Sequence, residues 1–546
     1  MSAKKSTATT ATKGKADKPM KPTKLTKSTK PDKTSKPSRS DKLTKADKLD
    51  KADRATKPVK PGTARNGAGT VVMATAENLH LAVEAAEQKM ARPGPVQRPD
   101  RLDAGKAIRQ QVPRAWHAAW EPAPNRRDPI AILEEQAETR LPDLIPIRHG
   151  RMVSSPFAFF RGAAAVMAAD LANTPDTGIP VQACGDAHLV NFGIFATPER
   201  HLVFDVNDFD ETLPGPWEWD VKRLAASIAV ASRENGCNRD DGDAAVISAV
   251  GAYRQRMYEL ATMRTLDLWY SRVDVDEIMM MVQAMETAPL GRMAEKTIAK
   301  ARTHDTLAAV AKLTDVVDGQ RRIVDHPPLI DHIALANAAD QIRMLYEGYL
   351  ASLSPELQML MNRFQLVDVA RKVVGVGSVG TRCWIALFEG GDDDDPLLLQ
   401  IKEAQPSVLE QELHLESIYR NHGERVVHGQ KLMQAASDLF LGWSLNPATG
   451  IHYYWRQLHD MKGSADVPAM SPLQLAGYAR ICGYALARAH ARSGDPAMIS
   501  GYLGSGDTFD RALVAFSQDY ADQNDRDYAA MVEAVRSGRI EAIEGI

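Results

Sequence analysis

Two acidic segments, close together in the chain, carry residue types that suit phosphate chemistry. The first reads Gly-Asp-x-His-x-x-Asn at residues 185–191, and the second reads Asn-Asp-Phe-Asp at residues 207–210. A phosphoryl-transfer site needs an aspartate that orients the attacking hydroxyl, together with an Asn and an Asp that hold Mg²⁺. Asn and Asp oxygens with bound waters suit this hard, octahedral ion. Asp186, Asn191 and Asp208 are thus candidates for one site.

A predicted β-hairpin joins the two segments. Residues 192–195 and 201–206 are short apolar stretches separated by a turn near Pro198, which is the pattern of a hairpin. It returns Asp208 to the side of Asn191. The alternative is structural, because Asp and Asn also favour turns and helix caps.

A second candidate site lies about 190 residues further on. Its loop contains Gly375, Gly377, Ser378 and Gly380. Strand-forming residues follow directly, so the pattern favours strand-loop-strand over the strand-loop-helix of a dinucleotide site. A third strand then presents Lys402. Such glycines let the backbone approach phosphates, and the lysine supplies a compact positive charge.

Three other interpretations of these residues stay open. The glycine segment is also compatible with a simple β-turn followed by an ordinary lysine. A nicotinamide-dependent dehydrogenase would use the acidic turn at residues 392–395 near a ribose. A mononuclear metal hydrolase would use His188 with Asp186 and Asp205, although the usual histidine-rich ligand set is missing.

Residues 184–220 resemble the catalytic loop and metal-binding segment of the aminoglycoside phosphotransferase and protein-kinase superfamily. That group often shows His-Gly-Asp-x-His-x-x-Asn, a short hairpin and an Asp-Phe segment, and Cys184 stands here at the first histidine. The resemblance implies that Asp186 is the catalytic base and that Asn191 and Asp208 bind the metal. Asp205 and Asp210 are alternatives to Asp208 as ligand.

The same resemblance implies roles for four further residues. Lys402 would contact the α- and β-phosphates of ATP, and Asp220 would tie the following helix back to the catalytic loop. A glutamate after Lys402 should pair with it, and Glu412 is favoured over Glu410 and Glu416. On helical spacing, His490 is expected to be a packed histidine.

Residues 130–540 also resemble the uncharacterised bacterial DUF2252 family. The recognisable phrases are Ser-Pro-Phe-Ala-Phe-Phe-Arg-Gly at 155–162, Asn-Asp-Phe-Asp-Glu-Thr at 207–212, Gly-Pro-Trp-Glu-Trp-Asp at 215–220 and Met-Lys-Gly-Ser at 461–464. That family name brings no established activity.

The order of the two sites predicts an unusual fold. In kinase-like enzymes the glycine loop and lysine precede the catalytic aspartate, and here they follow it. We therefore expect an α+β, protein-kinase-like two-lobed fold that is circularly permuted, with a small antiparallel β lobe and a large helical lobe. Permutation is feasible where chain termini lie close together. A domain-swapped dimer would give the same sequence.

The chain divides into six expected segments. They are a disordered basic tail (1–70), an N-terminal helix with a Pro/Arg-rich linker (71–129), the catalytic-loop segment of the large lobe (130–235), a helical connector (236–365), the small β lobe (366–465) and the C-terminal helices of the large lobe (466–546).

Charge is distributed unevenly. The net charge is -3, yet residues 1–65 carry 20 Lys or Arg against 6 Asp. This segment has little that could repay the entropy of ordering. It is expected to be either a solvated tail or a polycation that binds nucleic acid or another polyanion non-specifically.

Cysteine content and hydropathy favour the cytoplasm. The four cysteines stand far apart and form no Cys-x-x-Cys pair, so neither a zinc site nor a disulfide framework is indicated. The N-terminus is lysine-rich, and no apolar run is long enough to span a bilayer. We expect neither secretion nor a membrane anchor.

The sequence therefore predicts a phosphotransferase-like protein that uses ATP and Mg²⁺ and acts on a hydroxyl of a small molecule, with a protein as the second choice of acceptor. Nucleotidyl transfer is an alternative, because the same donors can bind ATP in the opposite sense. A non-catalytic nucleotide-binding regulator, whose basic tail associates with nucleic acid, is the other. Neither the acceptor nor the oligomeric state is encoded in a short motif.

Overall fold

The computed structural model describes residues 96–284, 288–303, 306–332, 338–373, 375–391, 395–458 and 461–546. These ranges belong to one compact unit, Met90–Ile546. The basic segment 1–70 and the amphipathic helix expected at 78–90 lie outside the described residues, as does most of the acidic turn at 392–395.

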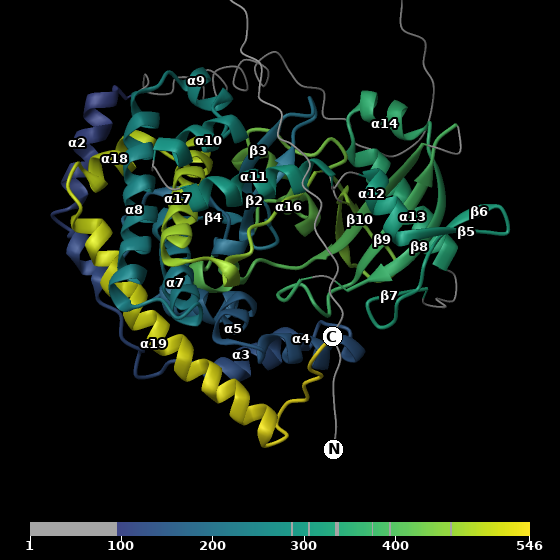
Figure 1. The fold of residues 1–546 in the computed structure, drawn as a ribbon, viewed down its shortest axis with the longest axis horizontal. Helices are drawn as coiled ribbons and strands as arrows, with labels where there is room; N and C mark the ends of the chain where they lie inside the picture. Colours follow the sequence, from purple (N-terminus) through teal and green to yellow (C-terminus); the bar gives the residue numbers. More distant parts are fainter. Residues whose placement is uncertain are drawn as a thin grey trace, which may run out of the picture. The chain divides into compact units, whose positions relative to one another are not determined.

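A six-stranded antiparallel sheet lies at the right of Figure 1, with strand order β11-β12-β10-β9-β8-β7. Its strands are β7 (Ile330–Asp331), β8 (Gln365–Lys372), β9 (Cys383–Glu389), β10 (Pro396–Ala404), β11 (Gly442–Leu445) and β12 (His452–Gln457). Strands β9, β10 and β12 confirm those expected from the sequence. Strand β8 ends at Lys372, where a strand was expected to begin.

Different helices pack against the two faces of this sheet. They are α12 (Thr306–Leu313), α13 (Ala338–Ser352) and α14 (Pro355–Met361). Side chains alternate along β10, so Leu399 and Ile401 join the core cluster that contains Tyr349 of α13. On the opposite face, which also carries Lys402, Leu398 packs in a cluster with Val310 of α12.

The acidic segments lie on short two-stranded sheets. These are formed by β1 (Pro180–Ala183) with β4 (Leu213–Pro216), and by β2 (Phe192–Ala196) with β3 (Leu202–Val206). The second pair is the predicted hairpin, with Phe192 opposite Val206. A 3-10 helix, η3 (Leu189–Asn191), leads into it, and the Asn207 amide donates to the Asn191 carbonyl at 2.9 Å. The hairpin therefore places the two acidic segments side by side.

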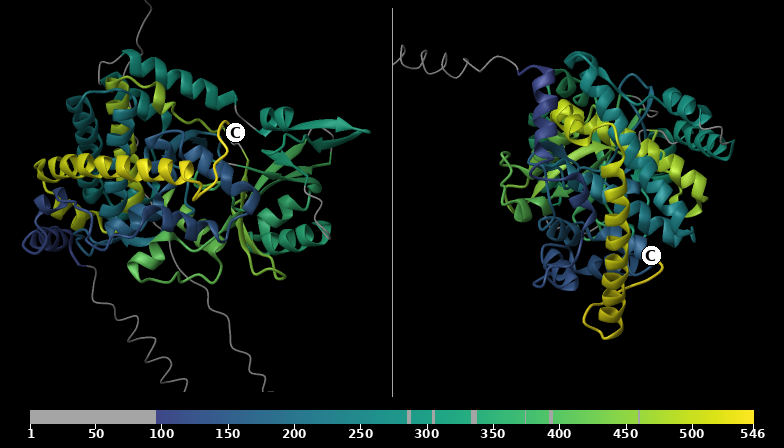
Figure 2. Two further views of the ribbon diagram at one scale, coloured as in Figure 1. Left: turned by 90° about the horizontal axis from the view of Figure 1, so that it is seen from below. Right: turned by 90° about the vertical axis from the view of Figure 1, so that its left-hand side faces the viewer.

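Helices surround these small sheets and share the largest core cluster. They include α7 (Trp217–Glu234), α8 (Arg239–Thr262), α9 (Thr265–Tyr270), α10 (Val275–Ala284), α11 (Ala288–Thr303), α17 (Pro472–Ser493), α18 (Pro496–Leu503) and α19 (Thr508–Arg536). Helices α7, α17 and α19 confirm three helices expected from the sequence. Helix α17 packs against α8, and α19 runs past α7, α8 and the N-terminal helices (Figure 2). In the described ranges, no helix has the length and apolar content that crossing a bilayer requires.

The chain before Ile130 is more structured than the expected linker. Helix α2 (Arg98–Ile108) packs against α18, and η1 (Arg114–Ala118) packs against α19. Arg126 donates to Asp170 at 2.7 Å and to Asp527 at 2.6 Å. These ion pairs dock a Pro/Arg-rich stretch whose composition alone resembles a linker.

Helices α3 (Pro129–Ala137), α4 (Ile145–Met152), α5 (Pro156–Gly162) and α6 (Ala164–Leu171), with the 3-10 helix η2 (Pro142–Leu144), form the next stretch. The apolar composition of residues 161–171 predicts one short helix. In the structure it is interrupted at Ala163, which has φ -108° and ψ 36°. Helix α5 begins earlier than expected because the Ser155 side chain caps it. The remaining elements are α15 (Val408–Leu413), α16 (His422–Met433), η4 (Val467–Ala469) and the hairpin β5 (Thr314–Val317) with β6 (Gln320–Ile323).

Candidate functional site

The catalytic-loop segment is held by the first turn of α7. The Asp220 carboxylate accepts from the backbone amides of Cys184 at 2.6 Å and Gly185 at 2.9 Å. Gly185 has φ +82°, and a Cβ there would lie 2.4 Å from the Glu211 carbonyl oxygen, so glycine is required. Asp220 thus ties the helix to the loop as the sequence indicates.

His490 supports this anchor and faces no cleft. Its Nε2 lies 3.0 Å from Asp220 Oδ2 and its Nδ1 lies 2.9 Å from the Tyr253 hydroxyl. It is fully buried, which confirms the expectation of a packed histidine. Cys184 forms a second internal link, because its Sγ donates to the Asp208 carbonyl oxygen at 3.2 Å.

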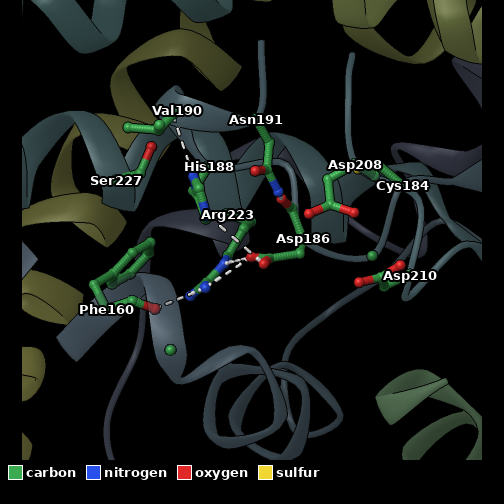
Figure 3. A network of polar contacts seen from close by, with 12 residues as sticks. Phe160, Cys184, Asp186, His188, Val190, Asn191, Asp208, Asp210, Arg223 and Ser227 are labelled. Carbon is green, nitrogen blue, oxygen red and sulfur yellow. Dashed lines mark hydrogen bonds and ion pairs between the residues drawn. The ribbon is translucent and has the colours of Figure 1, made fainter. Parts of the chain in front are cut away.

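Asp186 lies at the centre of Figure 3, paired with Arg223 of α7. Arg223 Nε donates to Asp186 Oδ1 at 2.9 Å, and His188 Nε2 lies 3.7 Å from Oδ2. The pKa of Asp186 is raised to about 6, chiefly by burial and to a smaller extent by Asp208, against the lowering effect of Arg223. A carboxyl with this pKa is largely ionised at pH 7 and can accept a proton.

Asn191 and Asp208 face the same space as Asp186 (Figure 3). The Asn191 Nδ2 donates to the Asp186 carbonyl oxygen at 2.6 Å, so its side-chain oxygen is left for another partner. Asp208 Oδ1 is buried and has no hydrogen-bond partner within the described residues. Lys402 Nζ lies 3.9 Å from the same oxygen and balances part of its charge. A buried carboxylate oxygen that accepts no hydrogen bond, beside an amide oxygen, fits a hard divalent cation such as Mg²⁺.

Asp205, the other expected metal ligand, lies elsewhere. Its carboxylate pairs with the buried Arg488 of α17 at 2.5 Å and is itself 3% exposed. The side chain alternates away from the cleft because it lies on strand β3, before the turn that presents Asp208. The expectation that Asp205 is a metal ligand is therefore wrong. The hydrolase site that would combine His188, Asp186 and Asp205 is not formed either. Within the described ranges, no group of three or more His, Cys, Asp or Glu side chains is placed to hold a metal.

Lys402 meets the acidic hairpin directly within one chain. Its Nζ lies 2.5 Å from Asp210 Oδ2 and 3.9 Å from Asp208 Oδ1. Asp210 also accepts from the Tyr454 hydroxyl at 2.6 Å and from Ser378 Oγ at 3.2 Å. Burial lowers the pKa of Lys402, but Asp208 and Asp210 outweigh it and hold the pKa well above its usual value. The lysine is therefore a buried cation.

Arginines hold the glycine loop against the N-terminal helices. Arg140 Nη1 donates to the carbonyl oxygens of Gly377 at 2.9 Å and Val379 at 2.5 Å, and Arg151 donates to Gly375. Gly375 and Gly380 have φ +68° and +92°, which favour glycine. Gly375, Gly377 and Ser378 line the cleft, whereas Gly380 packs against Arg140.

Glu412 is not the partner of Lys402. It lies on α15 with Oε1 3.9 Å from Arg127 Nη1, beside a neighbouring hollow. The carboxylate that pairs with Lys402 is that of Asp210. The physical reason is that the first turn of α15 binds Glu211, through Ser407 Oγ to the Glu211 carbonyl at 2.7 Å. The helix is therefore fixed with Glu412 beside Arg127 and with Leu413 packed against the largest core cluster.

Arg425 of α16 organises the acidic segment from behind. It donates to the carbonyl oxygens of Thr212 at 2.6 Å, Asp210 at 2.8 Å and Gln405 at 2.8 Å. Arg425 is buried. It joins the hairpin region to the chain that follows Lys402, and nothing in its local sequence signals this role.

The loop at residues 186–191, the acidic turn at residues 208–211 and the glycine loop line one cleft, and Lys402 adjoins it through Asp210. Its walls include Asp186, His188, Asn191, Asp208, Asp210, Glu211, Gly375, Val376, Gly377, Ser378, Thr381, Glu403, Ala404, Gln405 and Pro406. The cleft is also lined by Gln136, Arg140, Arg148 and Arg161, which the sequence analysis did not predict as site residues. Only Arg161 had a signal, since it lies in the recognisable phrase at 155–162.

The fold and cleft define a mixed α/β protein in which an antiparallel sheet and a helical region share one polar site. A family model described as "Uncharacterized protein conserved in bacteria (DUF2252)" matches residues 140–534. The chain belongs to this family. Comparison with curated proteins found no match, and comparison with solved structures found none either.

Proposed function

We propose that this protein is an ATP- and Mg²⁺-dependent phosphotransferase that acts on a hydroxyl group of a small-molecule acceptor. The observation that carries the proposal is the contact of Lys402 with Asp210 at 2.5 Å and with Asp208 at 3.9 Å. A phosphate-binding lysine and a metal-binding aspartate must lie close together around one triphosphate. Two segments far apart in the chain meet here in that way.

The connectivity of the sheet supports a permuted kinase-like fold. The glycine loop joins β8 to β9, Lys402 lies on the next strand, and α15 and α16 follow before β11 and β12 return beside β10. Kinase-like enzymes likewise place the lysine on the third strand and a helix after it. In this interpretation the sheet is the small lobe, and the catalytic segment precedes it in the chain because the order is permuted.

Each residue then has a defined task. Asp186 accepts the proton of the attacking hydroxyl, and Arg223 positions its carboxylate. Lys402 and the glycine loop bind the phosphates. Asn191 and Asp208 would hold Mg²⁺, which when bound would neutralise charge that develops on the phosphate oxygens.

One observation favours nucleotidyl transfer as the second candidate. The sheet face that carries Lys402 is covered beyond it by α12, whose Val310 packs with Leu398 and Ile385. A hollow of about 1830 Å³ adjoins the opposite side of the cleft, past Gln405 and Pro406. If the base of ATP lay in that hollow, the triphosphate would run through the cleft in the opposite direction. The α-phosphorus, instead of the γ-phosphorus, would then face the acceptor.

Binding and labelling experiments test both functions. We expect Mg²⁺-ATP to bind, and Lys402→Ala to weaken that binding about tenfold or more through loss of a charge-assisted contact. Lys106→Ala is the matched control, because Lys106 is exposed on α2. Acceptor labelling from γ-labelled ATP indicates phosphotransfer, and labelling from α-labelled ATP indicates nucleotidyl transfer. Equal ATP affinity in wild type and Lys402→Ala would refute the site.

A further inference from the structure

Arg148 is a buried cation without a counterion. It is 1% exposed on α4, and its Nη2 donates to Gln136 Oε1 at 3.1 Å and to the Gly162 carbonyl at 3.0 Å. Its Nε and Nη1 atoms are buried without a hydrogen-bond partner. No carboxylate pairs with it in the described part of the chain. A buried charge without a partner is strongly unfavourable, so such residues normally await a ligand or an opposite charge.

Two further arginines line the same cleft as Arg148. Arg140 uses one nitrogen on the glycine-loop carbonyls and leaves its buried Nε unpartnered. Arg161, at the end of α5, also has a buried Nε without a partner. Burial lowers the pKa of Arg148 well below its ordinary value, and the charge on Arg140 adds to that effect. Arg140 and Arg148 therefore repel each other, and an anion bound beside them would relieve this repulsion.

The acids of the cleft are already engaged. Asp186 pairs with Arg223, Asp210 with Lys402, and Glu403 with Arg382 at 3.0 Å. Glu211 accepts from the Val408 amide at 2.7 Å. Asp208 remains for a metal. Carboxylates act on Arg140 and Arg161 from a distance, but in the described part of the chain none forms an ion pair with any of the three arginines.

We propose that Arg140, Arg148 and Arg161 form an anion subsite for a phosphate group carried by the acceptor. One guanidinium group can donate two parallel hydrogen bonds to a phosphate group. Three guanidinium groups balance a phosphate dianion better than they would balance a single carboxylate. Asp208 and the glycine loop line the donor side of the cleft, and Lys402 lies next to Asp208. The acceptor hydroxyl must lie at Asp186, whose charge acts on Arg161, so the anion beside it belongs to the acceptor. This inference rests on the proposed function.

Inorganic phosphate is the probe for this subsite. Titration calorimetry in chloride buffer of matched ionic strength should show phosphate binding to the wild-type chain without nucleotide. Arg161→Gln should weaken it about tenfold or more. Arg264→Gln, at a side chain 85% exposed, should leave it unchanged. Unchanged phosphate affinity in Arg161→Gln, or no binding to wild type, overturns the subsite.

Arg148→Met provides a second, independent measurement. Removing an unbalanced buried charge should raise the melting temperature of the phosphate-free protein and abolish the stabilisation that phosphate gives to wild type. A structural arginine would behave oppositely, with a lower melting temperature and intact stabilisation by phosphate. That result would overturn the proposal.

A last titration separates the two sources of phosphate. If the subsite serves the acceptor, phosphate should bind equally well when the chain is saturated with Mg²⁺ and a non-hydrolysable ATP analogue. Competition between the two would assign the arginines to the donor and overturn the acceptor assignment. Failure of the analogue to bind would refute the phosphotransferase, while the nucleotide-free phosphate titration would still decide the anion subsite.

Discussion

Lys402 Nζ and Asp210 Oδ2 lie 2.5 Å apart although 192 residues separate them in the chain. The lysine side chain is only 2% exposed and that of Asp210 is 27% exposed. A contact of this kind fastens the sheet to the acidic hairpin. The strength of this contact and the roles of the residues around it can each be tested by substitution.

Breaking the pair from one side should destabilise the protein. Asp210→Asn leaves the buried Lys402 unbalanced, and we expect a loss of about 2 kcal/mol, below the usual cost of a fully buried pair because Asp210 is partly exposed. The double variant Lys402→Met with Asp210→Asn should recover part of that loss, giving a coupling energy of about 1 kcal/mol or more in denaturant unfolding. Additive effects would show that the pair contributes nothing.

The pKa of Asp186 predicts how turnover depends on pH. Because this pKa is about 6 in the folded chain, the base is protonated below pH 6. Turnover should fall about tenfold for each pH unit below 6 and be level above it. Arg223→Gln should move this limb to higher pH, since Arg223 lowers the pKa. A profile that does not respond to Arg223→Gln would contradict the assigned base.

The same group makes a signed contribution to stability. Its pKa rises from 3.8 to about 6 on folding, so between these values the folded chain holds more protons than the unfolded one. Asp186 should therefore cost stability progressively as pH rises from about 4 to about 6. The difference in unfolding free energy between Asp186→Asn and wild type should grow over this window and then level off. A constant difference would show that the pKa is not raised.

Asp208 and Asp205 make a matched pair of variants. Asp208→Asn removes a charge from the proposed metal site, so the Mg²⁺ concentration for half-maximal ATP binding should rise about tenfold. Asp205→Asn should leave that concentration unchanged and instead lower stability by about 3 kcal/mol, because it breaks the buried pair with Arg488. A shift in Mg²⁺ dependence with Asp205→Asn would restore it as a ligand.

Asp220 should matter for stability and turnover together. Asp220→Asn weakens three contacts to a buried carboxylate, at Cys184, Gly185 and His490, and should cost about 3 kcal/mol. The displaced loop should also reduce turnover more than ATP affinity, since Asp186 follows Gly185 directly. Asp522→Asn is the control, because the Asp522 side chain on α19 is exposed. Equal stability of both variants would show that the anchor is dispensable.

Deleting residues 1–70 tests the basic segment. It should abolish salt-sensitive retention on a polyanion such as heparin, because retention by lysines weakens as salt rises. ATP affinity should stay the same, since the cleft residues all lie after residue 130. Retention that survives the deletion would locate polyanion binding in the body of the protein.

The anchoring role of Asp220 followed from the resemblance to kinase-like enzymes, and local patterns in the sequence predicted the acidic hairpin and the strands that carry the glycine loop and Lys402. These features depend on neighbours within about 40 residues, so alternation, turn residues and spacing reveal them. These patterns did not predict the helix interruption at Ala163 or the packing of the segment before Ile130 against the C-terminal helices. Both depend on contacts with distant helices, such as those of Arg126 with Asp170 and Asp527.

The sequence alone determined which chemistry the chain can support, because carboxylates, an amide, a lysine and flexible glycines are properties of residue type and short spacing. Only the tertiary structure decided the partners. In the folded chain Lys402 pairs with Asp210 instead of Glu412, and Asp205 forms a buried ion pair with Arg488. Arg148 lines the cleft without a counterion among the described residues. Burial and charge pairing are sums over the whole folded chain, and no short stretch of residues contains them.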